Sequence, residues 1–177
     1  DAKRADIGNT TRQYAELLDD VDAITVNPYL GRDSLQPFLD RGDKGVFVLC
    51  RTSNPGGADL QDLELASGEP VYERVAALAE LWNDTGNVGL VVGATAPEEL
   101  ADLREQVPGI PFLVPGVGAQ GGDVEAAVEY GLADGVGLVN SSRGIIFAGE
   151  GRTDFAGAAG EAAKRLRNRL QQYRTDG

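Results

Sequence analysis

An acid, a lysine and a second acid stand at Asp1, Lys3 and Asp6. If residues 1–3 form the carboxyl end of a β-strand, Asp1 and Lys3 share one face and lie about 6.6 Å apart along it. Asp6 follows beyond the strand end, where a loop carboxylate can reach the same site or a neighbouring subunit. An ammonium group fixed between carboxylates can stabilise developing negative charge and deliver a proton. The alternative is a surface salt-bridge cluster.

The residues that follow favour the chemical interpretation. Residues 1–10 resemble the pattern Asp-x-Lys-x-x-Asp-Ile-Gly-x-Thr of orotidine 5'-phosphate decarboxylases, in which it marks the end of the third barrel strand, and every position is matched. The resemblance implies that Lys3 is the proton donor and that Asp1 lies beside the departing carboxylate. It also implies that Asp6 serves the neighbouring active site of a homodimer and that Thr10 contacts the ribose. Thr10 is equally a candidate helix cap.

A second group of polar residues is expected to bind phosphate. The glycine-rich segment 116–122 lies between a predicted strand and a predicted helix, so backbone N–H groups and the helix dipole point to one place. Arg143 follows the next strand and can donate two parallel hydrogen bonds to a phosphate. Loops after the last two strands form the recurrent phosphate site of (β/α)8 barrels. The resemblance implies that Gln120 and Arg143 hold the nucleotide phosphate, with Gly121 and Gly122 as backbone donors.

The longest predicted connection, 51–70, begins with a polar turn that contains Ser53. Connections of this length are uncommon in compact domains unless they form lids or binding loops. An ordinary polar turn is the alternative interpretation. The resemblance implies that Ser53 presents its hydroxyl and backbone N–H to the polar edge of a pyrimidine, under a loop that excludes water.

Strand and helix patterns alternate along the chain. Apolar strands without polar alternation favour a parallel sheet covered on its outer face. Polar motifs at the carboxyl ends of nearly all strands favour a (β/α)8 TIM barrel, an α/β fold, over an open doubly wound sheet. We expect strands at 23–26, 45–50, 88–92, 111–114 and 136–140, and helices at about 10–19, 33–40, 71–82, 95–106, 123–130 and 155–173.

The length of the chain sets how much of a barrel it can form. Such barrels typically need ~250 residues. We therefore expect residues 1–177 to form a single domain with roughly the last six strands, and the first two β/α units to lie upstream. The absence of methionine also predicts that the sequence starts within a longer gene product.

Composition narrows the possible partners. A formal net charge of −12 argues against nucleic acid and anionic membranes, and no apolar run approaches the roughly 20 residues of a membrane span. The absence of histidine removes the usual general base and the commonest metal ligand. The single cysteine, Cys50, suits a reducing cytoplasm.

The resemblance implies a carboxy-lyase that converts orotidine 5'-monophosphate to uridine 5'-monophosphate and CO2 without a metal or an organic cofactor. Two alternatives stay open. Sugar-phosphate decarboxylases and aldolases with the same barrel share Asp-x-Lys-x-x-Asp but use Mg²⁺, and Ser53 and its long loop speak against them. A non-catalytic nucleotide-binding fragment is the other alternative, because the family's second-strand lysine and first-strand aspartate are not present in this sequence.

Overall fold

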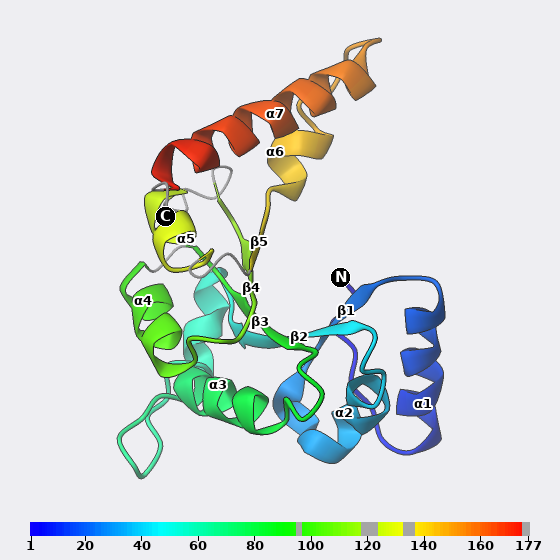
Figure 1. The fold of residues 1–177 in the computed structure, drawn as a ribbon, viewed down its shortest axis with the longest axis vertical. Helices are drawn as coiled ribbons and strands as arrows, with labels where there is room; N and C mark the ends of the chain where they lie inside the picture. Colours follow the sequence, from blue (N-terminus) through cyan, green and yellow to red (C-terminus); the bar gives the residue numbers. More distant parts are fainter. Residues whose placement is uncertain (95–96, 118–123, 133–136, 175–177) are drawn as a thin grey trace.

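The computed structural model describes residues 1–94, 97–117, 124–132 and 137–174. A parallel sheet of five strands runs through it in the order β1-β2-β3-β4-β5 (Figure 1). The sequential order has no reversal of the kind that defines a doubly wound sheet, and this confirms the predicted barrel class. The strands are β1 Ala23–Val26, β2 Gly45–Arg51, β3 Val88–Val92, β4 Phe112–Pro115 and β5 Gly137–Asn140.

The opening segment extends this sheet beyond β1. Arg4 forms a parallel bridge with Val26, so one further strand position lies beside β1. The bridge agrees with the expectation of about six strands, although residues 1–3 are not themselves extended as a strand.

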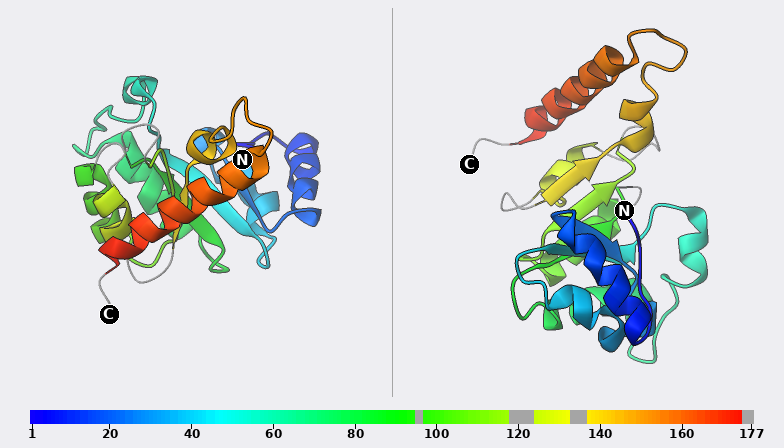
Figure 2. Two further views of the ribbon diagram at one scale, coloured as in Figure 1. Left: turned by 90° about the horizontal axis from the view of Figure 1, so that it is seen from above. Right: turned by 90° about the vertical axis from the view of Figure 1, so that its right-hand side faces the viewer.

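Helices follow the strands and cover the sheet. Helices α1 and α2 lie at the β1 end of the molecule, while α6 and α7 lie at the β5 end (Figures 1 and 2). None of the described helices combines the length and the apolar character that crossing a bilayer requires. The α-helices are α1 Asn9–Ala15, α2 Arg32–Leu39, α3 Val71–Leu81, α4 Pro97–Gln106, α5 Val124–Glu129, α6 Ser142–Ile146 and α7 Phe155–Tyr173, and the short 3₁₀ helices are η1 Glu16–Asp19, η2 Pro28–Leu30 and η3 Pro55–Asp59.

Most predicted elements are confirmed, with differences at the ends of some strands and helices. Helix α1 begins at Asn9 after Gly8, which has a positive φ of 62° and makes no side-chain cap, so Thr10 is not the helix cap. The short helix α6 was not expected. The predicted starts at 95, 123 and 136 fall outside the described residues.

The two faces of β2 have different environments, and this difference positions the site. Val46, Val48 and Cys50 alternate into the buried core, whereas the residues between them are only half-buried. Successive side chains of a strand point to opposite faces, so the half-buried set faces the barrel interior. Leu49 of this set contributes to the cavity described next.

Candidate functional site

A cavity of about 590 Å³ lies at the carboxyl ends of the strands. Its apolar floor consists of Leu49, Val91 and Leu113, which are register partners across β2, β3 and β4. This volume falls within the range of roughly 300–1,000 Å³ that is usual for small-molecule sites. The remaining lining is mostly polar and comes from the opening segment, the start of the long loop and the ends of β4 and β5, namely Asp1, Lys3, Thr52, Ser53, Asn54, Pro115, Asn140 and Ser142.

Asp1 and Lys3 form an ion pair at the mouth of this cavity. Lys3 Nζ lies 2.5 Å from Asp1 Oδ2, and the side chains of Lys3 and Asp1 are 48% and 68% exposed. The predicted strand geometry was wrong for Lys3, because its φ is +49°, the one positive φ outside glycine in the described chain. The two side chains nevertheless line the same cavity, as expected.

Thr25 of β1 binds both of these residues and was not singled out from the sequence. Its hydroxyl donates to Asp1 Oδ1 at 2.8 Å and accepts from the Lys3 backbone N–H at 3.0 Å. The one available signal was a polar residue within the apolar strand Ala23–Val26.

Ser53 lines the same cavity, next to Thr52 and Asn54. Its backbone packs against Gly93 at the end of β3, where an added Cβ would lie 3.0 Å from the Ser53 nitrogen. Thr52 is also held, because its N–H donates to Gln61 Oε1 at 2.9 Å. The first residues of the long loop are therefore fixed at the rim of the cavity.

Arg51 joins the base of the long loop to α4. Its Nε lies 2.5 Å from Glu99 Oε2, and its Nη2 lies 3.2 Å from Asp62 Oδ1. The hydrogen bond to Glu99 is the main cause that raises the pKa of Arg51. Burial raises the pKa of the adjacent Tyr72, whose ring contacts the Arg51 guanidinium, to about 12.

Arg143 lines a smaller pocket of about 170 Å³. This pocket shares Pro115, Asn140 and Ser142 with the larger cavity, so the two adjoin. Arg143 itself is exposed in the first turn of α6. The other residues that were expected to bind phosphate, Gln120, Gly121 and Gly122, lie outside the described residues.

Asp6 and Thr10 do not line the described part of the cavity within this chain. Asp6 Oδ1 accepts a hydrogen bond of 2.8 Å from the Ile7 N–H. Thr10 is exposed in the first turn of α1. The expected reach of Asp6 into a neighbouring subunit stays a prediction. Across the described ranges, no group of three or more Cys, Asp or Glu side chains is arranged to hold a metal ion.

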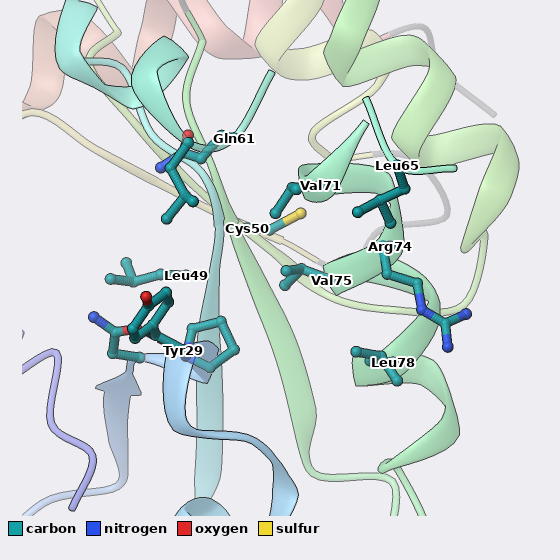
Figure 3. Close-up of a pocket in the computed structure, with 12 residues that line it drawn as sticks. Tyr29, Leu49, Cys50, Gln61, Leu65, Val71, Arg74, Val75 and Leu78 are labelled. Carbon is teal, nitrogen blue, oxygen red and sulfur yellow. Dashed lines mark hydrogen bonds between the residues drawn. The ribbon is translucent and has the colours of Figure 1, made fainter. Parts of the chain in front are cut away.

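A second cavity, of about 470 Å³, lies between the long loop and α3. Figure 3 shows Leu49, Val75 and Leu78 around it, with the Cys50 thiol between the strand and the helix. Gln61 lines this cavity and also binds Thr52, which lines the larger one. The loop base therefore separates two cavities.

A parallel barrel sheet with a ligand-sized cavity and an adjoining arginine-lined pocket at the strand carboxyl ends is the arrangement of a (β/α)8-barrel enzyme. The chain belongs to the orotidine 5'-phosphate decarboxylase / HUMPS family, whose model matches residues 1–156.

Relatives within this family are close. The chain is 78% identical over 186 residues to an orotidine 5'-phosphate decarboxylase of Halorubrum lacusprofundi, and 72% identical over 187 residues to that of Haloarcula marismortui. These alignments cover 98% of this chain but 67% and 68% of the relatives, so the chain spans about two thirds of their length.

Solved structures show the same fold. The Leishmania donovani OMP decarboxylase superposes with a TM-score of 0.82 at 44% identity, covering 97% of this chain and 67% of that one. An orotidine 5'-monophosphate decarboxylase of Methanocaldococcus jannaschii, complexed with the inhibitor BMP, gives a TM-score of 0.74 at 25% identity, covering 95% of this chain and 71% of that one.

Proposed function

We propose that this protein decarboxylates orotidine 5'-monophosphate to uridine 5'-monophosphate and CO2. The observation that carries the proposal is that Asp1 and Lys3 line a cavity, and that Arg143 lines a smaller pocket directly beside it. A nucleotide has its reacting base and its phosphate at opposite ends, so it matches this arrangement. The family and its curated relatives support the same reaction.

The proposed reaction breaks the bond between C6 of the pyrimidine and its carboxyl carbon. The electron pair of that bond stays on C6, and CO2 departs. Lys3 is the proposed stabiliser of this charge and the donor of the proton that forms the new C–H bond. Asp1 lies beside the departing carboxylate and holds the ammonium through the 2.5 Å contact.

In the remaining proposed contacts, the base, the ribose and the phosphate of the nucleotide are each bound by a different segment of the chain. Ser53 binds the polar edge of the pyrimidine from the loop that begins at Arg51. Arg143 forms bidentate hydrogen bonds with the phosphate. Thr10, which does not line the described part of the cavity in its own chain, is the proposed ribose contact by the resemblance of its segment to the family. Gln120, Gly121 and Gly122 complete the phosphate site by the resemblance of their segment to the family.

We also propose a homodimer in which Asp6 reaches the active site of the neighbouring subunit. Asp6 lies three residues beyond Lys3, its carboxylate is exposed, and it stands outside the described cavity lining of its own chain, which suits a role across an interface. The substrate and the single buried Cys50 are consistent with a cytoplasmic enzyme.

The test is orotidylate turnover by the protein expressed from its complete gene, with and without a chelator. Turnover that survives the chelator supports the proposal, whereas strict Mg²⁺ dependence supports a sugar-phosphate enzyme of the same barrel. Calorimetry with uridine 5'-monophosphate separates the third possibility, because a non-catalytic protein binds the nucleotide without turning over its substrate.

A further inference from the structure

We propose that Thr25 is a positioning residue that sets the orientation of Asp1 and the backbone conformation of Lys3. The inference rests on the proposed function, because it assigns Thr25 to the same reaction. Thr25 does not line the described cavity and acts through the two residues that do.

The two hydrogen bonds of the Thr25 hydroxyl fix which of them it donates and which it accepts. The Lys3 backbone N–H can only donate, so the Thr25 oxygen accepts there, at 3.0 Å. The hydroxyl proton is then available for the Asp1 carboxylate, whose Oδ1 lies at 2.8 Å. Thr25 is only 5% exposed, so water does not readily replace either contact.

The two oxygens of Asp1 have different partners. Oδ1 accepts from Thr25, and Oδ2 contacts Lys3 Nζ. A carboxylate held at one oxygen has a fixed plane, so Thr25 determines where the other oxygen meets the ammonium. Loss of the hydroxyl leaves Asp1 free to rotate and removes the fixed contact of Lys3.

Thr25 also holds the unusual backbone of Lys3. A φ of +49° is uncommon for a residue with a side chain and persists when neighbouring contacts enforce it. The Thr25 hydroxyl binds the Lys3 N–H, and the Thr25 carbonyl accepts from the Arg4 N–H at 3.2 Å. The Arg4 carbonyl in turn accepts from Asn27 N at 3.0 Å. The backbone of Lys3 and of the residue that follows it is therefore held by β1 and by Asn27, and the Lys3 side chain turns from this fixed backbone toward the cavity.

The strand does not need this hydroxyl for packing. Ile24 and Val26, on either side of Thr25, are buried in the core on the opposite face. Valine has nearly the shape of threonine and a high preference for strands. Thr25→Val thus removes the two hydrogen bonds while it keeps the strand, and Thr25→Ser keeps the hydroxyl.

The experiment compares these variants in the protein expressed from its complete gene. We expect Thr25→Val to lower kcat by about 100-fold, the loss that a displacement near 1 Å can cause, with a much smaller change in KM. Thr25→Ser is expected to retain most of the activity. Thr85→Val, at an exposed threonine whose hydroxyl donates to Asn87, is the matched control and should leave kcat unchanged.

A second readout does not depend on turnover. Crystal structures of the parent, of Thr25→Val and of Thr25→Ser show directly whether the contact between Lys3 Nζ and Asp1 Oδ2 is kept. If Thr25 holds Asp1 in place, this contact is lost in Thr25→Val alone.

The outcomes separate the two proposals. A parent protein that binds nucleotide but does not decarboxylate orotidylate overturns the proposed function, while the crystal structures still decide the role of Thr25. An unchanged contact between Lys3 and Asp1 in Thr25→Val overturns the positioning role. So does a Thr25→Ser variant as impaired as Thr25→Val, because the hydroxyl would then not be what matters.

Discussion

Gly93 and Ser53 are packed so closely that a side chain on Gly93 would require Ser53 to shift by a few tenths of an ångström. A Cβ on Gly93 would lie 3.0 Å from both the nitrogen and the Cβ of Ser53. The Gly93 N–H also donates to the Arg51 carbonyl at 2.8 Å. The end of β3 therefore supports the backbone that carries Ser53 into the cavity.

Gly93→Ala is expected to displace Ser53 and lower kcat/KM for orotidylate by roughly 10- to 100-fold, because small displacements of positioning groups are costly. Steady-state kinetics measures this loss. Gly109→Ala is the matched control, since an added Cβ there meets nothing within 4 Å. Equal effects of the two substitutions would contradict a specific role for the Gly93–Ser53 contact.

Lys3→Ala should reduce turnover by about 10⁴-fold or more, because it removes both the stabilising charge and the proton donor. Binding of uridine 5'-monophosphate should remain detectable by calorimetry. Lys164→Ala, on the exposed face of α7, serves as the control and should behave as the parent. Decarboxylation retained by Lys3→Ala would remove Lys3 from the proposed role.

Arg143→Ala should weaken binding of uridine 5'-monophosphate by about 10- to 100-fold, the equivalent of roughly 1.5–3 kcal/mol for hydrogen bonds to a charged group. Binding of uridine, which lacks the phosphate, should not change. Calorimetry with both ligands tests this difference directly. A parallel loss of affinity for uridine would show that Arg143 supports the fold of α6 instead.

Arg51→Ala should lower the free energy of unfolding by about 2 kcal/mol, because it leaves Glu99 and Asp62 without their cation in a partly buried place. Urea titration measures the change. Arg32→Ala is the control, since Arg32 contacts Asp84 at the same 2.5 Å distance but both side chains are largely exposed. That exposed pair is expected to contribute less than about 1 kcal/mol.

Alkaline pH should destabilise the protein through Cys50. Burial raises the pKa of the Cys50 thiol, so it stays neutral in the folded state, while an unfolded thiol ionises near pH ~8.5. The contribution of the neutral Cys50 thiol to the free energy of unfolding is complete below that pH and falls as the pH rises above it. Urea titrations between about pH 8 and 10 should show a shallower decline for Cys50→Ala than for the parent, before unfolded tyrosines ionise near ~10.

The strands could be predicted from the sequence because their apolar runs are short and bounded by polar turns. The runs at Ala23–Val26 and Val88–Val92 correspond to β1 and β3 at every residue. The placement of Lys3 and Ser53 at one cavity followed from the shared carboxyl edge of parallel strands. This part of the site depends on the parallel order of the strands, which the alternation of strand and helix patterns in the sequence indicates.

Other features depend on tertiary contacts that leave little trace in the sequence. Lys3 carries no signal for a positive φ, unlike a glycine, because its backbone is bound by residues of the neighbouring strand β1 that lie 22 positions further along the chain. Helix α6 has only five residues and contains Gly144, so local preference does not predict it. Thr25 itself resembles an ordinary strand residue until its hydroxyl partners are known.

The larger cavity spans the sheet from the segment beside β1 to the pocket after β5. A nucleotide bound there would contact both margins of the described sheet. Binding to the folded state alone adds its free energy to that of folding. Nucleotide binding should consequently also protect the strands at both margins from amide hydrogen exchange, and the two measurements report the same binding free energy.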